Sequence, residues 1–395
     1  MDILILCILG LLIVVMRYFK IGDYFSPWMI TLVIWFAMFF MFQFQNDVLY
    51  PMAPQFYESF AIWMPIFLVS SLLTFYLLPG VPDEESACIS DMHLNHGVFN
   101  VLFAISVIIT PLYAWQILKI VTMFDTTDLL YNIRIFAIYG EDDFGFLNYA
   151  FVINQALLIV AIWKYPAIPL WQLIVVYLTN TISCLAIMEK GGMFIMVTTT
   201  LFMLFERKII KTRSIVITIL AVIAIFFFMN MAREEQSSDA DSMTFVDFFA
   251  IYVLSPPVAY GRVAVDLATQ FGSHTFQTIY LFLNRFGGDY EVNVKLQEFV
   301  MVPLPTNVYT IFQPFFQDFG QRGIAIFALA YGFLSGVSYR YFRNGSAMGR
   351  CFYSFMVYVL ILQFYQENIM MSMVFTVQLI FFMWIMVEKR YKIRL

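Results

Sequence analysis

Long apolar runs separated by short polar segments dominate the sequence. There are eleven such runs, and they lack the strict alternation of a membrane β-barrel strand. A helix needs about 20 apolar residues to cross a bilayer, and backbone that faces lipid must form its hydrogen bonds within the helix. The pattern therefore predicts an all-α polytopic membrane protein with about eleven transmembrane helices, within about 10 to 12. The runs cover residues 2–16, 27–44, 58–79, 97–118, 146–163, 167–188, 192–205, 214–231, 323–339, 351–368 and 372–387.

The longest polar interval lies between the eighth and ninth runs, at residues 232–322. Two apolar stretches interrupt it, at 245–254 and 278–283, and both are too short to cross a bilayer comfortably. We expect them to form in-plane or re-entrant helices at the membrane surface. The predicted organisation is thus eight membrane helices in 1–231, one large external loop in 232–322, and three membrane helices with a C-terminal tail in 323–395.

The amino-acid composition further narrows the possible classes of protein. Hydrophobic residues make up 62% of the chain and charged residues 12%, against about 45–50% and about 25% in a soluble domain. The net charge of −5 does not indicate a basic surface that would bind nucleic acid. The four cysteines form no CxxC pair, and the chain lacks a P-loop and an HExxH motif. We therefore expect no metal, no cofactor and no nucleic-acid partner.

The distribution of Lys and Arg predicts the orientation in the membrane. With the C-terminus in the cytoplasm, 14 of the 22 basic residues lie on the cytoplasmic side. Four of the other eight, from Arg262 to Arg322, lie in or at the end of the long loop, where the positive-inside rule does not count them. The segment 80–96 is placed in the cytoplasm although it carries no Lys or Arg. This orientation puts the N-terminus and the long loop on the outer face.

Cationic side chains lie in the predicted outer segments and at the ends of apolar runs. A guanidinium group binds phosphate oxygens through two parallel hydrogen bonds, so arginines at a membrane surface suit a phosphate or diphosphate. The candidates are Arg134, Lys190, Arg233, Arg262 and Arg285. For any one of them, a solvated loop charge is the competing interpretation.

Lys190 shows why the two interpretations stay open. It lies in the tight hairpin Glu189-Lys190-Gly191-Gly192, between the sixth and seventh runs. Polar residues at membrane depth are costly and commonly functional. A lysine at the end of a span also serves as an interface anchor that keeps its charge in water.

Two further residues of the long loop are candidate general bases. His274 is the histidine assigned to the outer face, and imidazole takes a proton near neutral pH. A lone loop histidine also occurs without any such role. Asp318 lies at the start of the ninth run, beside Gly320 and Gly323, which permit close backbone approach. A helix N-cap is the alternative role for Asp318.

The segment around Asp318 also carries a resemblance to a known family. Pro305-Thr306-Asn307-Val308-Tyr309-Thr310-Ile311-Phe312 is followed by Phe316-Gln317-Asp318-Phe319-Gly320 and Gly323. This resembles the Asn-Val-Tyr-Thr … Asp-x-Gly-x-x-Gly stretch of bacterial O-antigen and capsule repeat-unit polymerases, the Wzy family. The hairpin at Lys190 resembles a basic, glycine-containing hairpin that precedes a mid-chain span in that family.

The resemblance implies a glycosyltransferase with a GT-C-like membrane fold in the bacterial inner membrane. Such enzymes act on the periplasmic face, without a metal, on oligosaccharides linked to undecaprenyl diphosphate. It also implies functional arginines in periplasmic loops, which Arg233, Arg262 and Arg285 match by location, and it assigns Asn307 and Tyr309 to substrate binding. Implied partners are the lipid-linked substrates, membrane lipids, a flippase and a chain-length regulator.

The chemistry of that reaction agrees with the residues at hand. Negative charge develops on a departing diphosphate, and fixed cations such as Arg285 stabilise it. A base, His274 or Asp318, activates the acceptor hydroxyl. Tyr280 and Tyr290 are expected either to stack on sugars or to lie in the interfacial aromatic belt.

Two other functions remain open from the sequence. An O-antigen ligase has the same architecture, but it joins finished glycan to the lipid A core. A flippase or other transporter of lipid-linked units is also polytopic, yet it commonly shows repeated halves with polar residues at the midplane. In this sequence no repeat is evident, and Glu367 near a span end is the feature that favours transport.

Overall fold

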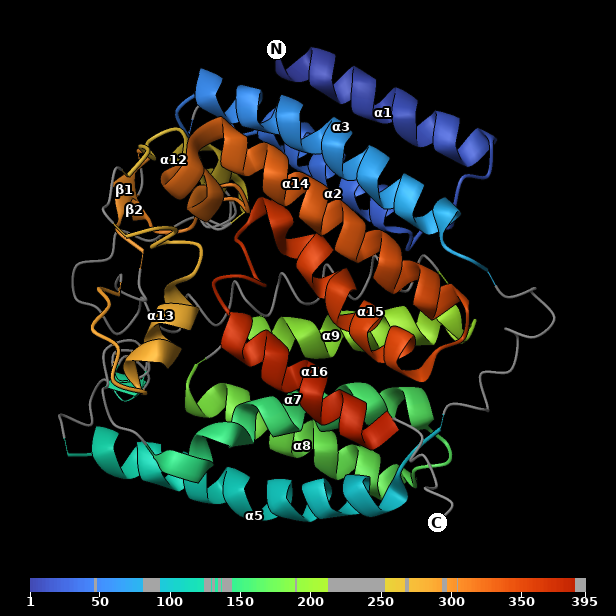
Figure 1. The fold of residues 1–395 in the computed structure, drawn as a ribbon, viewed down its shortest axis with the longest axis vertical. Coiled ribbons are helices and arrows are strands. Elements are labelled where there is room, and N and C mark those ends of the chain that lie inside the picture. The colour runs from blue at the N-terminus through green and yellow to red at the C-terminus, as the bar shows by residue number, and fades with distance from the viewer. Residues whose placement is uncertain are drawn as a thin grey trace. The chain divides into compact units, whose positions relative to one another are not determined.

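A computed structural model gives the fold, shown in Figure 1. It describes residues 1–395 except 46–47, 81–92, 124–128, 130–131, 134–135, 137–143, 189, 212–252, 267–269, 293–296, 304 and 388–395. Helices dominate the described residues. In chain order these helices are α1 Asp2–Tyr18, α2 Pro27–Phe42, α3 Pro54–Leu77, α5 His96–Val121, η3 Gly145–Tyr149, α7 Ala150–Lys164, α8 Leu170–Ala186, α9 Lys190–Glu206, α12 Ser255–Tyr260, α13 Gln277–Asn284, α14 Gln313–Arg343, α15 Ala347–Ile361, η5 Leu362–Phe364 and α16 Met373–Val387. The strands β1 Val300–Met301 and β2 Pro305–Thr306 pair antiparallel.

Several of these helices have the length and composition of membrane spans. Among the described residues, five are long and apolar enough to cross a membrane. They are α3, α5, η3 continued by α7, α14, and α15 continued by η5. The helices α2, α8 and α16 are apolar but shorter. The mainly helical character predicted from the sequence is confirmed, whereas the number of eleven spans stays a prediction.

Helices form where ten of the eleven apolar runs lie, and the remaining run, 214–231, falls outside the described residues. The largest difference in boundaries is at α14. This helix begins at Gln313, ten residues before the predicted start at 323, and it bends at Gly320. The extra arm, 313–319, is part of the segment that we assigned to the loop. A short helix, α13, also forms at the predicted apolar stretch 278–283.

The chain divides into two compact units that alternate along the sequence. Unit 1 comprises residues 1–80, 242–340 and 359–374. Unit 2 comprises residues 81–241, 341–358 and 375–395. The two are described separately below.

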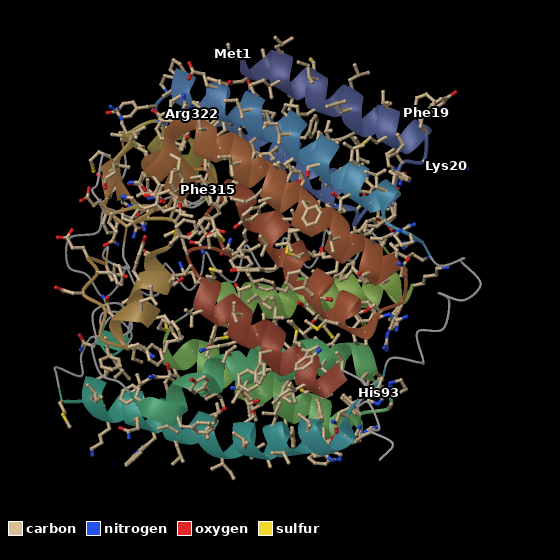
Figure 2. The ribbon with its side chains drawn as sticks, viewed as in Figure 1. Met1, Phe19, Lys20, His93, Phe315 and Arg322 are labelled. Carbon is tan, nitrogen blue, oxygen red and sulfur yellow. The ribbon has the colours of Figure 1, made fainter. Side chains whose placement is uncertain are left out.

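In unit 1, the helices α1, α2, α3 and α14 run side by side (Figure 1). Met1 and Phe19 mark the two ends of α1 (Figure 2). The helix α14 approaches α3 closely because it carries glycines one turn apart. A Cβ atom at Gly332 would lie 2.7 Å from the carbonyl oxygen of Phe67, and one at Gly336 would lie 2.6 Å from that of Ser71. Small residues four apart permit such backbone contact between apolar helices.

Aromatic packing holds the short arm of α14 in place. The ring of Phe312 stacks on Trp35 with 5.5 Å between centroids, and Phe315 stacks on Trp63 at 6.2 Å. Phe315, labelled in Figure 2, also stacks on Phe327, and the two ring centroids are 4.0 Å apart. All three contacts bury aromatic surface against α2, α3 or α14 itself, so the arm has a fixed position despite its polar residues.

In unit 2, α7 is the central helix. Thirteen of its fifteen residues are buried, which is expected of a helix that is apolar on all sides. It packs against α5, α8 and α9. Asn154 links these helices by hydrogen bonds: its Oδ1 accepts from Ser106 Oγ at 2.5 Å, and its Nδ2 donates to Thr110 Oγ1 at 2.9 Å and to the Thr179 carbonyl at 3.1 Å.

Candidate functional site

The segment 253–322 of unit 1 carries most of the predicted site residues that the structure describes. Its first element, α12, is attached to the start of α3. Gln55 Nε2 donates to the carbonyl oxygens of Tyr260 and Val263 at 3.1 and 2.8 Å. Ser59 Oγ and the Tyr260 hydroxyl are 2.7 Å apart. Burial raises the pKa of the Tyr260 hydroxyl above its ordinary value, so it stays neutral in this contact.

Asp318 ties the loop to the short arm of α14. Its Oδ1 accepts from the backbone N–H of His274 at 3.1 Å, and its Oδ2 accepts from that of Thr275 at 2.6 Å. The Ser273 hydroxyl lies 3.5 Å from Oδ1, and Thr275 Oγ1 donates to the Pro314 carbonyl at 3.2 Å. Asp318 thus caps the turn at 273–275 across the fold, and it does not act as the N-cap of the membrane helix.

Asp266 completes the cluster, and sequence analysis had not singled it out. Its Oδ2 lies 2.9 Å from His274 Nε2, with side-chain exposures of 46% for Asp266 and 15% for His274. The Asp266 backbone N–H donates to the Gln317 carbonyl at 2.8 Å, next to Asp318. The structure therefore brings Asp266, His274 and Asp318 together, and we call these three residues the loop cluster.

Two glycines shape the backbone around the loop cluster. Gly320 has φ +59° and ψ −149°, a combination that is essentially restricted to glycine, and it turns the short arm into the long part of α14. Gly323 lies where a Cβ would be 2.2 Å from the Phe315 carbonyl oxygen. The Asp-x-Gly-x-x-Gly pattern thus has a local explanation: the carboxylate holds the loop, and each glycine permits the bend.

A second carboxylate fixes the other side of the loop. Glu367 Oε1 accepts from the backbone N–H of Ile369 and Met370 at 2.6 and 2.9 Å, and Oε2 accepts from that of Met371 at 2.7 Å. The Tyr331 hydroxyl also donates to Glu367. Thr278 Oγ1 on α13 in turn donates to the Met370 carbonyl at 3.3 Å. Glu367, the residue that favoured a transporter, is engaged in these structural bonds.

The predicted substrate residues occupy different settings. Asn307 is half-buried, whereas Tyr309 is buried and its hydroxyl donates to the Glu298 carbonyl at 2.8 Å. Burial raises the pKa of Tyr309 to about 12. The rings of Tyr280 and Tyr290 are 5.1 Å apart at the exposed end of α13. Tyr280 and Tyr290 are therefore more accessible to a sugar than Tyr309.

In the described parts of the chain, Arg262 and Arg285 form no ion pair with the loop cluster. Arg262 is exposed, with its guanidinium 5.7 Å from the centre of the Tyr50 ring, and Arg285 is exposed just after α13. Neither forms an ion pair with another residue in the described parts of the chain. Lys190 begins α9 and belongs to unit 2, while Arg134 and Arg233 lie outside the described residues.

The loop cluster contains an imidazole and two carboxylates, which are groups that serve in general acid–base catalysis. When Asp266 accepts the Nε2 proton of His274, the lone pair of the imidazole is on Nδ1, which is then the basic atom. The contact with Asp266 also holds the imidazole ring in one orientation. Asp318, through the N–H groups of residues 274 and 275, fixes the backbone that carries this imidazole. The exposed guanidiniums nearby in the sequence are suited to anionic groups.

Several apolar helices of membrane-crossing length together suggest a multi-pass membrane protein, here with an ionisable cluster on a loop. The chain is similar to an Escherichia coli (strain K12) protein named "Putative O-antigen polymerase", with 28% identity over 124 residues. The aligned part is 31% of this chain and 31% of that protein, so the chain spans about a third of the length of the curated relative it matches. No family model matches the chain, and no solved structure matches it.

Proposed function

We propose that this protein polymerises oligosaccharide repeat units carried on undecaprenyl diphosphate, as a metal-independent glycosyltransferase of the Wzy type. Three things support the proposal: the partial similarity to the Escherichia coli protein, the Asn307–Gly323 motif, and the helices of membrane-crossing length. On this proposal about eleven helices span the bacterial inner membrane in a GT-C-like arrangement. The N-terminus and the loop cluster face the periplasm, and the C-terminus faces the cytoplasm.

The observation that carries the proposal is the contact between the two candidate bases. His274 and Asp318 are 44 residues apart in the chain, yet the N–H of His274 donates to Asp318. Asp266 adds a carboxylate to the imidazole at 2.9 Å. These contacts support one proposed role for each residue. His274 is the base, Asp266 orients its ring, and Asp318 positions the backbone.

The proposed reaction transfers a glycan to a sugar hydroxyl. The hydroxyl oxygen of the acceptor repeat unit forms a bond to the anomeric carbon of the donor glycan. The bond from that carbon to the diphosphate oxygen breaks, and its electron pair leaves with undecaprenyl diphosphate. The hydroxyl proton passes to His274 Nδ1. General-base assistance of this kind contributes about 10²–10⁴-fold to the rate.

The leaving diphosphate gains negative charge as the bond breaks, so it needs cations or hydrogen-bond donors. Arg262 and Arg285 are exposed on the same loop, without an ion pair in the described parts of the chain, and are proposed to serve the diphosphate. Arg134, Arg233 and Lys190 remain proposed diphosphate ligands by location. Asn307, which is half-buried beside β2, is proposed to contact the sugar.

The test uses purified full-length protein with lipid-linked repeat units and follows product length on gels. His274→Ala is expected to slow chain growth by about 10²–10⁴-fold. Asp266→Asn is expected to slow it less, because the base remains. The matched control is His96→Ala, an exposed histidine at the start of α5 in unit 2, which should retain full activity. Normal chain growth by His274→Ala at normal protein level contradicts the assignment of the base.

The same assay separates polymerase from the other two functions. Longer products made by purified protein exclude a flippase, which changes the location of the unit and not its length. In cells, loss of a polymerase leaves lipid A core with one repeat unit, whereas loss of a ligase leaves bare core. Arg262→Ala and Arg285→Ala should shorten the products. Arg17→Ala, at the end of α1, is their control because its guanidinium lies against Tyr24 outside the loop.

A further inference from the structure

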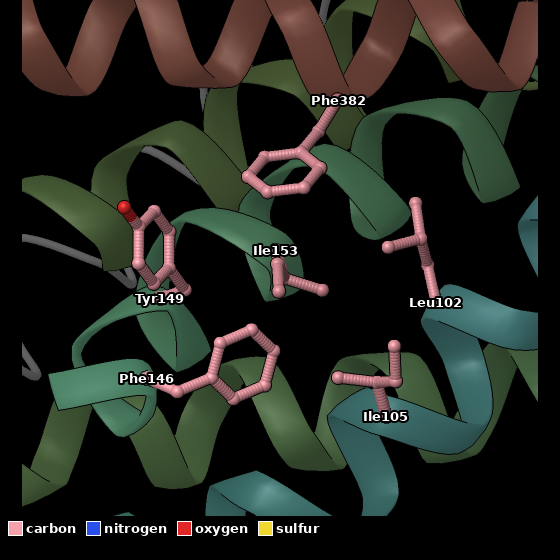
Figure 3. A pocket seen from close by; sticks show the side chains of 6 residues that line it. All are labelled: Leu102, Ile105, Phe146, Tyr149, Ile153 and Phe382. Atoms are coloured by element: carbon pink, nitrogen blue, oxygen red, sulfur yellow. The ribbon is translucent and has the colours of Figure 1, made fainter.

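An apolar groove lies within unit 2. Its volume is about 400 Å³, and apolar side chains line it almost completely. Figure 3 shows these side chains converging on one space from α5, η3, α7 and α16. They are Leu102, Ile105, Phe146, Tyr149, Ile153 and Phe382. A dry apolar space of this size suits a hydrocarbon group and offers too few polar partners for ordered water.

The groove is continuous with a surface that suits lipid. Its bottom is formed by Ile153, which is 1% exposed, and its rim by Phe146, which is 57% exposed. Along α5, the neighbouring side chains Ile108 and Trp115 are 61% and 59% exposed. Both α5 and the helix formed by η3 and α7 have membrane-crossing length. An apolar groove beside helices of this length is suited to hydrocarbon and not to bulk water.

A lysine lies at one end of the exposed apolar surface of α5. Lys119 is exposed in the last turn of α5, with Nζ 5.7 Å from the ring of Trp115. Phe144, just before η3, packs at 6.1 Å on Tyr113, which lies between Ile105 and Lys119 on α5. A tryptophan with a neighbouring lysine at the end of a span is typical of the headgroup level of a membrane.

The distance between cation and groove fits one leaflet. Ile105 and Lys119 are 14 residues apart on one helix, which corresponds to about 21 Å along its axis. Half of a bilayer, including its headgroups, is about 20–22 Å thick. At 100° per residue the two side chains are only about 40° apart around the helix. A lipid phosphate at Lys119 therefore places the end of its own chain at the level of Ile105.

We propose that the groove holds the terminal part of one acyl chain of an anionic phospholipid, whose phosphate pairs with Lys119. The lipid acts as a bound structural component of unit 2. This proposal does not depend on the proposed polymerase activity, because it concerns a different set of residues and needs no turnover.

The experiment uses the full-length protein in vesicles of phosphatidylcholine with a minority of phosphatidylglycerol that carries a photoreactive diazirine at the end of one chain. After irradiation, mass spectrometry locates the cross-linked residues. We expect cross-links at the residues of the groove. Ile105→Trp should reduce them to the background level, because the indole fills the space. Val107→Trp is the matched control, an exposed position of α5 about 200° around the helix from Ile105, and it should leave them unchanged.

Lys119→Gln tests the headgroup without changing the groove, and it remains informative if Ile105→Trp fails to fold. Removing one surface lysine should lower the preference for phosphatidylglycerol over phosphatidylcholine about fivefold. Cross-links spread evenly over the exposed face of α5, or an unchanged preference in Lys119→Gln, would overturn the proposal. Displacement of the probe by polyprenyl phosphate at equal concentration would overturn it too, because the groove then belongs to the carrier lipid.

Discussion

Asp318 in unit 1 and Asn154 in unit 2 each connect several segments through side-chain hydrogen bonds. One of the two side chains is charged and the other is neutral. Asp318 is a carboxylate that collects backbone N–H groups of a loop with an exposed neighbour, Asp266. Asn154 is neutral and fully buried, and it collects two hydroxyl groups and a carbonyl from α5 and α8.

The difference follows from the cost of burying charge. A neutral amide with its hydrogen bonds made is tolerated among apolar helices, whereas an unpaired charge there is expensive. The ionisable residues of the loop cluster therefore lie near the ends of the apolar helices. Proton transfer and anion binding are possible there because water and charged ligands can reach these side chains. The helices α5, α7 and α8 of unit 2 by contrast are joined through neutral polar groups and close packing, which are features of stability. Substitutions in the two regions should separate activity from stability.

The largest effect is expected for Asp318→Ala. It leaves the N–H groups of His274 and Thr275 without their acceptor, at a cost of about 1–3 kcal/mol each. A displacement of the imidazole by about 1 Å lowers a rate by about 10²-fold. Chain growth should fall by at least that factor, and amide hydrogen exchange in residues 272–276 should accelerate.

The control for Asp318→Ala is Asp289→Ala, an exposed aspartate on the same loop. It should change neither chain growth nor hydrogen exchange. If amide hydrogen exchange in residues 272–276 of Asp318→Ala proceeds at the wild-type rate, Asp318 does not position this segment. That conclusion holds whether or not the variant is active.

A stability effect without a change in the chemistry is expected in unit 2. Asn154→Leu deprives the hydroxyls of Ser106 and Thr110 of the amide to which they bond and should cost about 2–3 kcal/mol. Asn180 is also fully buried, but neither atom of its amide has a hydrogen-bond partner among the residues that the structure describes. Asn180→Leu should therefore be neutral or stabilising, since it removes an uncompensated polar group. Unfolding of both purified variants in the same detergent gives the comparison, and equal losses would contradict it.

Close packing predicts the next effect. At Gly192, in the first turn of α9, a Cβ would lie 2.6 Å from both Cys184 Sγ and Gln155 Nε2. Gly192→Ala should destabilise unit 2 by about 1–3 kcal/mol, as overpacking does. At Gly97, in the first turn of α5, the nearest atom to a Cβ is Asn95 Oδ1 at 3.6 Å. Gly97→Ala should be neutral or slightly stabilising. A smaller loss for Gly192→Ala than for Gly97→Ala in thermal unfolding contradicts this view of the packing.

The helices were predictable because each apolar run is a local property of the sequence. The run 146–163 corresponds to η3 and α7 at residues 145–164. The short arm of α14 was not predictable, because Gln313, Gln317 and Asp318 interrupt its apolar pattern. Its position is determined by ring contacts with Trp35 and Trp63, which are distant in the sequence.

The candidate site was predictable only in part. His274 and Asp318 stood out by residue type and by the motif, but nothing in the sequence indicates that one binds the other. Asp266 was missed because its contact with His274 depends on the fold of the loop and has no periodic spacing. Gly320 was recognised as permissive, yet the direction of its bend comes from the packing on both sides.

The smallest effect is expected for Tyr309→Phe, and the size of this loss of stability depends on pH. Tyr309→Phe removes the hydrogen bond to the Glu298 carbonyl and should cost about 1 kcal/mol near neutral pH. Burial, and then the charge of Glu298, raises the pKa of the Tyr309 hydroxyl from its ordinary value of 10.0 to about 12. The folded state therefore holds this proton more tightly than the unfolded state, so its contribution to stability is complete below pH 10 and is lost as the pH rises toward 12.

Phenylalanine has no proton to lose, so the stability gap between wild type and Tyr309→Phe should narrow above pH 10. Measuring both proteins together cancels the titration of the other tyrosines, which they share. Unfolding in detergent at a series of pH values from neutral to alkaline gives the gap directly. A gap that stays constant across this range would mean that Tyr309 is not buried around its hydroxyl, and the turn between β2 and α14 would then be more open to substrate than the structure indicates.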